Sequence, residues 1–191
     1  MKTGRLEAFS DGVLAIIITI MVLEMKVPEG SGFEALKPTL PVFLTYVLSF
    51  IYVGIYWNNH HHLLYAVNKV NGKILWTNLN LLFWLSLLPF VTGWMGENHF
   101  EANPTALYGV ILFMAALAFK ILVHHVIKNE GKNSNVGKIY SNDRKLIISL
   151  LLYFFGIVAS FLQPFIGLLI YLGVALIWFV PDKRIEQTLK E

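Results

Sequence analysis

The stretch that decides the fold is "RLEAFSDGVLAIIITIMVLEM", residues 5–25. It contains an apolar run of the length needed to cross a bilayer, which takes about 20 mostly apolar residues. The stretch nevertheless opens with Arg5, Ser10 and Asp11, and Glu24 stands at its end. Polar side chains are costly in hydrocarbon and usually face other protein groups there. The stretch therefore predicts a transmembrane helix with one side held by polar partners on neighbouring helices.

The composition of the whole chain is that of a membrane protein. Of the 191 residues, 56% are hydrophobic and only 14% are charged, and the mean hydropathy is +0.61. A soluble domain of this size could not bury so much apolar surface. The net charge of +3 fits cytoplasmic loops that favour Lys and Arg, so no nucleic-acid partner is expected. Because the chain has no cysteine, disulfides and Cys-based metal sites are excluded.

Hydropathy divides the chain into six apolar segments close to the length of a membrane span. We expect helices at about 6–25, 39–64, 74–95, 105–126, 145–162 and 164–180. Lys and Arg gather at the helix ends that share a side with the N-terminus, and this bias predicts that both termini are cytoplasmic. The fold class expected is an all-α integral membrane protein, with residues 1–191 forming a single six-helix unit in the lipid bilayer.

The predicted topology places several polar side chains at one depth near the cytoplasmic surface. The first helix begins there, the second ends there with "YWNNHHH" (56–62), and the third begins there with "WTNLN" (76–80). At about 1.5 Å per residue, these groups fall within about 10 Å of one another along the membrane normal. They can then satisfy one another across three helices. The expected interhelical polar network comprises Arg5, Ser10, Asp11, Trp57, Asn58, His60 and Asn78, with Asp11 as the main acceptor.

This network admits more than one role. It can simply hold three helices together, as in a membrane scaffold without transport activity. It can also relay protons through Asp11 and a histidine, which would make the chain a proton-coupled secondary transporter. Transporters typically show paired broken helices in repeated halves, and the sequence shows none.

The sequence motifs support neither a metal site nor an enzyme. The three consecutive histidines 60–62 point about 100° apart on a helix and cannot face one ion, so no structural metal is expected. H-E-x-x-H, G-x-S-x-G and P-loop motifs are all missing from the sequence. We therefore expect no enzyme activity, no catalytic residues, no cofactor and no small-molecule substrate.

A different side of the first helix carries Ile16, Thr19 and Leu23 at spacings i, i+3 and i+7, so they share one stripe. The stripe can face lipid or packed protein, or it can line a narrow pore around a symmetry axis as an apolar constriction. In a pore, Glu24 would lie at the outer mouth and concentrate cations. One subunit makes a poor pore alone, so an oligomer would be needed. No "TVGYG" stretch is present, which excludes an ordinary potassium-channel filter.

Three spaced motifs resemble a known family. They are R-x-x-x-F-S-D at residues 5–11, "YWNNHHH" with Trp57 three residues before His60, and "TNLNLLFWLSLLPF" (77–90) with Asn78 eleven residues before Pro89. These motifs are similar to those of the lysosomal and endosomal potassium channel family of the transmembrane protein 175 type and its prokaryotic homologues. The resemblance covers the first three predicted helices.

The resemblance implies a multi-pass potassium channel in a bacterial plasma membrane. It implies a homotetramer in which the first helices surround the pore and the F-S-D motif, including Phe9, faces the second and third helices. It places the constriction and the permeant potassium ion at Ile16, Thr19 and Leu23. Potassium sheds its water at a lower cost than sodium does. A narrow apolar ring with Thr19 hydroxyls could therefore favour potassium modestly.

Overall fold

The helices follow the apolar segments of the sequence. The computed structural model describes residues 3–140 and 144–179, and within these ranges it contains no strand. Its helices in chain order are α1 (Gly4–Leu23), the 3-10 helix η1 (Phe33–Thr39), α2 (Leu40–Tyr65), α3 (Gly72–Ser86), α4 (Leu88–Glu97), α5 (Ala102–Glu130), α6 (Asn135–Tyr140), α7 (Arg144–Leu162) and α8 (Pro164–Phe179). The all-α class expected from the sequence is confirmed for the described residues.

Several helices are long and apolar enough to cross a membrane. By length and composition these are Gly4–Leu23, Phe33–Tyr65, Gly72–Glu97, Ala102–Glu130 and Arg144–Leu162. The described part of α8 is apolar but shorter, at 16 residues. The end of the sixth predicted segment at residue 180, and both chain ends predicted to be cytoplasmic, lie outside the described residues.

The third predicted segment is two helices rather than one. α3 ends at Ser86 and α4 begins at Leu88. Pro89 has no N–H to donate to the carbonyl of Leu85, and its ring crowds that carbonyl, so the helix breaks just before it. The amide of Leu87 instead bonds three residues back, to the carbonyl of Trp84, at 3.3 Å.

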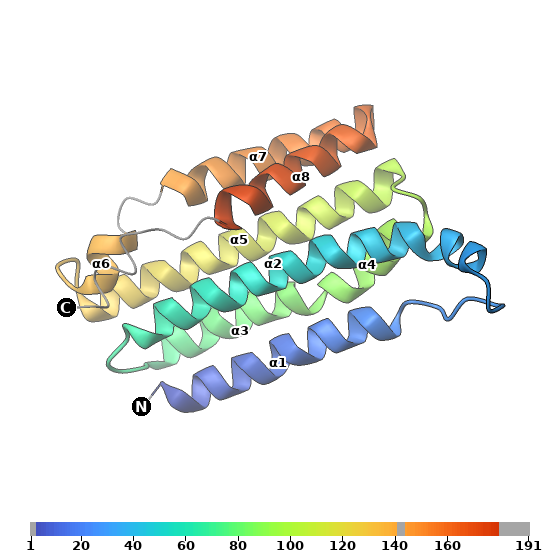
Figure 1. Cartoon of the computed structure of the whole chain (residues 1–191). Coiled ribbons are helices and arrows are strands. Elements are labelled where there is room, and N and C mark those ends of the chain that lie inside the picture. The colour runs from blue at the N-terminus through green and yellow to red at the C-terminus, as the bar shows by residue number, and fades with distance from the viewer. Residues whose placement is uncertain (1–2, 141–143, 180–191) are drawn as a thin grey trace.

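The helices form one bundle with α1 along one edge and the α7–α8 pair along the opposite edge (Figure 1). α1 contacts α2, α3 and α4, whereas α5 contacts α3, α4, α7 and α8. In the most apolar stretch of α5, 61% of the residues are buried, compared with 28% in the corresponding stretches of α1 and α7. α5 is therefore the central helix, and α1 is a peripheral helix with much of its surface uncovered.

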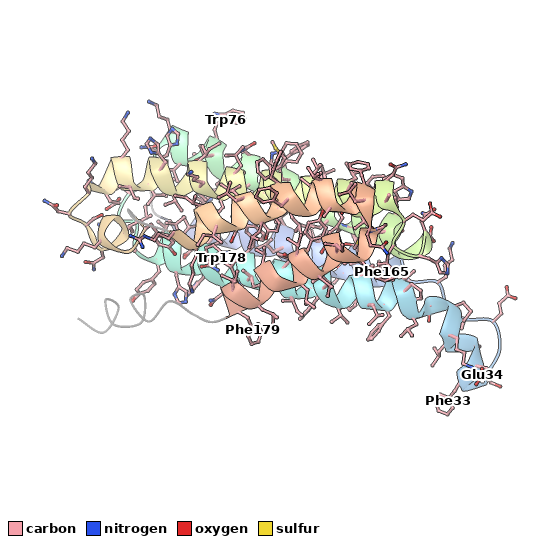
Figure 2. The ribbon with its side chains drawn as sticks, turned by 90° about the horizontal axis from the view of Figure 1, so that it is seen from above. Phe33, Glu34, Trp76, Phe165, Trp178 and Phe179 are labelled. Carbon is pink, nitrogen blue, oxygen red and sulfur yellow. The ribbon has the colours of Figure 1, made fainter. Side chains whose placement is uncertain are left out.

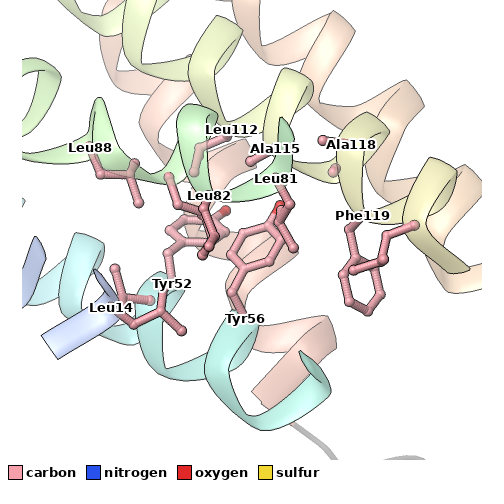
Figure 3. Close-up of a cluster of buried hydrophobic side chains, with 14 of the residues drawn as sticks. Leu14, Tyr52, Tyr56, Leu81, Leu82, Leu88, Leu112, Ala115, Ala118 and Phe119 are labelled. Atoms are coloured by element: carbon pink, nitrogen blue, oxygen red, sulfur yellow. The ribbon is translucent and has the colours of Figure 1, made fainter. Parts of the chain in front are cut away.

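The core combines large aromatic side chains with small residues that make room for them. Tyr52 and Tyr56 of α2 point into the bundle toward leucines of α3 and the Ala115 region of α5 (Figure 3). α2 and α4 approach closely at Gly96, where an added Cβ would lie 2.6 Å from the Cα of Val42. Burial of these side chains sets the positions of α2, α3 and α4, and these three helices form the surface that α1 packs against.

Candidate functional site

A chain of buried hydrogen bonds ties α1 to α3 and α2. The Asn78 amide nitrogen donates to Ser10 Oγ at 3.0 Å, and the Ser10 hydroxyl donates to the Leu6 carbonyl at 2.8 Å. The Asn78 amide oxygen lies 2.6 Å from His60 Nε2. Because that oxygen can only accept, His60 carries its proton on Nε2 and donates it to Asn78. The bonds therefore run in one direction, from α2 through α3 to α1.

The burial of this chain is nearly complete. Ser10 and Asn78 are 0% exposed and His60 is 2% exposed. In such surroundings an unpaired donor or acceptor is costly, so each member depends on the next. The chain fixes both the depth and the rotation of α1 against its neighbours.

Asp11 bonds to a different neighbour from the adjacent Ser10. Trp57 Nε1 on α2 donates to Asp11 Oδ1 at 3.1 Å, and both side chains are exposed in the single chain. The Trp57 ring stacks on the His61 ring with a centroid distance of 6.1 Å and an interplanar angle of 22°. Since successive residues project about 100° apart around a helix, α1 is held on two sides by Ser10 and Asp11.

The observed hydrogen bonds differ from the predicted network in the central residue and in which residues take part. The buried hub is Asn78 and not Asp11. Arg5 and Asn58 are exposed and Phe9 is 54% exposed, and within the described residues none of the three joins the hydrogen-bond chain. Each lies on a helix face turned away from the neighbouring helix. On α2 the buried amide is Asn59, which bonds back to the Ile55 carbonyl of its own helix at 2.8 Å.

The structure separates α1 into two faces. The covered face carries Leu6, Ser10, Leu14, Ile17 and Met21, which pack against the bundle. The uncovered face, here called the α1 stripe, carries Ile16, Thr19 and Leu23. In the single chain Ile16 is 58% exposed, Leu23 is 81% exposed and Thr19 is exposed.

The only hydroxyl of the α1 stripe keeps its oxygen available. Thr19 Oγ1 donates its proton to the Ile16 carbonyl of the same helix at 2.9 Å. The remaining lone pairs of that oxygen can accept a hydrogen bond or coordinate a cation. The stripe therefore offers apolar surface with one oxygen ligand in its middle.

A groove of about 620 Å³ follows the C-terminal end of α1. Its lining includes Glu24, Glu29 and Glu97. Lys26 bridges to Glu97 at 2.7 Å, and this bond raises the pKa of Lys26. Glu24 is exposed and has no ion pair within the described residues, so it contributes negative charge beside the stripe.

A second polar cluster, which the sequence reasoning missed, holds the other half of α1. Ser49 Oγ lies 2.6 Å from Thr92 Oγ1 and 3.0 Å from the Tyr108 hydroxyl. Thr92 Oγ1 also donates to the sulfur of Met21 at 3.9 Å. The cluster joins α1, α2, α4 and α5. The available signal was the spacing of Ser49, Tyr52, Tyr56 and His60, which is typical of one helical face.

Comparison with known proteins gives consistent matches. Residues 5–89 match the family described as the endosomal/lysosomal potassium channel TMEM175. A protein named as a potassium channel from Chryseobacterium sp. (strain P1-3) is 60% identical over the full length of both chains. Another so named, from Streptomyces collinus, is 36% identical over 66% of each chain. The crystal structure of a lysosomal potassium-selective channel TMEM175 homologue from Chamaesiphon minutus superposes with a TM-score of 0.77 at 26% identity. That match covers 92% of this chain and 95% of the other.

Proposed function

The chain belongs to the endosomal/lysosomal potassium channel TMEM175 family, and from this premise we propose that it is a potassium channel subunit whose pore runs along the α1 stripe. Members of this family are ion channels and not enzymes. The proton-coupled transporter alternative is not favoured, because the relatives and the structural neighbour are named as channels.

The observation that carries this proposal is the polarity profile of the exposed residues of α1. The α1 stripe, from Ile16 to Leu23, is about 10 Å tall at 1.5 Å per residue, and exposed Phe9 adds apolar surface closer to the N-terminus. Asp11 and Glu24, exposed beyond the two ends of the stripe, are about 20 Å apart along the helix axis. A hydrocarbon layer is about 30 Å thick, so a lipid-facing α1 would hold at least one carboxylate in hydrocarbon. A water-filled pore with a short apolar constriction accommodates both.

We further propose a homotetramer in the plasma membrane of a bacterium. Its symmetry axis would bring four copies of the α1 stripe together. Each chain carries one α1 stripe, and a closed ring of copies would cover it while leaving a conduit along the axis. The hydrogen bonds of Ser10 and Asp11 would then hold each pore helix against its own subunit.

Modest potassium selectivity follows from partial dehydration in the constriction. Rings of Ile16 and Leu23 would force an ion to shed part of its hydration shell, and this step costs less for potassium than for sodium. The free lone pairs of Thr19 Oγ1 would replace part of the lost water. Glu24 at the outer mouth would raise the local concentration of cations.

Bi-ionic reversal potentials of Ile16→Asn and Leu23→Ala channels test the proposal. The purified protein is reconstituted in planar bilayers with potassium on one side and sodium on the other. We expect larger single-channel conductance and a reversal potential closer to zero in both variants, because the ring becomes wider or wetter.

A matched control is Val22→Ala, since Val22 is 43% exposed but lies about 100° from Leu23 around the helix. The control should conduct like the parent protein. Unchanged selectivity and conductance in both stripe variants would show that the α1 stripe is not the constriction.

A further inference from the structure

A polar groove of about 530 Å³ lies between the start of α3 and the end of α5, at the end of the bundle predicted to be cytoplasmic. It is lined by Asn71, Gly72, Lys73, His125, Lys128 and Asn129. We call it the basic groove. Its lining residues are far from those of the α1 stripe in the sequence, and the proposed pore does not use them.

The floor of the basic groove is held by hydrogen bonds between the α2–α3 loop and α5. Asn71 Nδ2 donates to Asn129 Oδ1 at 2.8 Å, and Asn129 Nδ2 donates to the Lys69 carbonyl at 2.9 Å. Next to them, Asn68 Nδ2 donates to Glu130 Oε2 at 2.7 Å. The loop is clamped to α5, so the groove is formed before any ligand arrives.

The positive charge of the groove is not neutralised by the protein itself. Lys73 and Lys128 are exposed and form no ion pair within the described residues. The nearby carboxylate of Glu130 accepts hydrogen bonds from Asn68 and Asn129; it keeps its charge but does not line the groove. The positive end of the α3 helix dipole at Gly72 adds to the field of the two lysines. The groove therefore favours an anion.

The surface next to the groove has the character of a membrane interface. Trp76, one turn after Lys73, is 75% exposed and projects away from the bundle (Figure 2). Exposed Leu79 and Phe83 continue from it along α3. Tryptophan favours the level of lipid headgroups. The anion site therefore adjoins an apolar strip that suits acyl chains.

We propose that the basic groove binds the phosphate headgroup of an acidic phospholipid from the adjacent leaflet. Lys73 and Lys128, on two different helices, contact the phosphate, while the acyl chains lie along Trp76, Leu79 and Phe83. Basic pockets between transmembrane helices on the cytoplasmic side are suited to acidic headgroups. This assignment does not depend on which face of α1 lines a pore.

Native mass spectrometry of the full-length protein, titrated with phosphatidylglycerol or phosphatidylcholine in detergent, tests the assignment. We expect Lys73→Gln/Lys128→Gln to bind phosphatidylglycerol about 30-fold more weakly than the parent. The electrostatic attraction of one lysine for an acidic headgroup strengthens binding about fivefold, and the double variant removes two lysines. Lys73→Arg/Lys128→Arg should retain binding.

The matched control is Lys132→Gln/Lys138→Gln, which removes the same charge from exposed positions beyond the end of α5. It should bind within about threefold of the parent, since these lysines do not line the groove. Equal weakening in the two double variants would overturn the proposal in favour of a diffuse charge effect. Equal affinity for phosphatidylcholine, or displacement of the lipid by millimolar inorganic phosphate, would also overturn it. Unchanged thermal unfolding of the groove variant ensures that lost binding is not lost folding.

Discussion

Replacing Asn78 with alanine removes the link between His60 and Ser10. The side chain makes two interhelical hydrogen bonds, of 2.6 and 3.0 Å, at a site that is 0% exposed. Loss of its oxygen leaves the buried His60 N–H without an acceptor, at a cost of about 1–3 kcal/mol. Loss of its nitrogen removes a bond worth about 1 kcal/mol in a membrane protein. Ser10 keeps its bond to Leu6, so we expect a total destabilisation of about 3 kcal/mol.

Thermal unfolding in detergent, followed by gel filtration, measures this loss. For a chain of this length 3 kcal/mol corresponds to a Tm lower by about 6–12 °C. The matched control is Asn80→Ala, because Asn80 lies two residues further along α3 and has no hydrogen bond from its amide within the described residues. Adding His60→Ala to Asn78→Ala should cost about 1 kcal/mol less than the sum of the two single changes. An unchanged Tm for Asn78→Ala, or equal losses for Asn78→Ala and Asn80→Ala, would refute the hydrogen-bond chain.

Two further predictions concern the packing of α1 and α4, and both are measured by thermal unfolding in detergent. Asp11→Ala should lower the free energy of unfolding by about 1 kcal/mol, since Trp57 Nε1 loses its acceptor at an exposed site. Asp11→Asn should keep the bond and the parent Tm. Equal Tm values for the two variants would contradict this. Gly96→Ala should cost about 1–3 kcal/mol, because the methyl group would lie 2.6 Å from Val42 Cα, whereas Gly173→Ala meets nothing within 4 Å and should be neutral or stabilising. Equal effects at the two glycines would show that α2 and α4 separate without strain.

The depth of the polar groups was predictable, but their pairing was not. Ser10, His60 and Asn78 fall at one level once the topology and the rise per residue are known. Their partners depend on the rotation of three helices about their own axes, which packing determines. The adjacent pair Asn58 and Asn59 illustrates this, since only Asn59 turns toward the bundle. Pro89 signals a break in its helix by residue type alone.

By itself the sequence determined the membrane class, most of the apolar segments, the family and the spacing of the α1 stripe. These properties depend on hydropathy and helical period, which act along the chain. Only the tertiary structure decided that Asn78 is the hub, that Ser49, Thr92 and Tyr108 meet, and that Lys73 and Lys128 line one groove. Those contacts join residues from different helices, many of them far apart along the chain. Their distances are set by side-chain volumes and close helix approaches, which no local pattern in the sequence records.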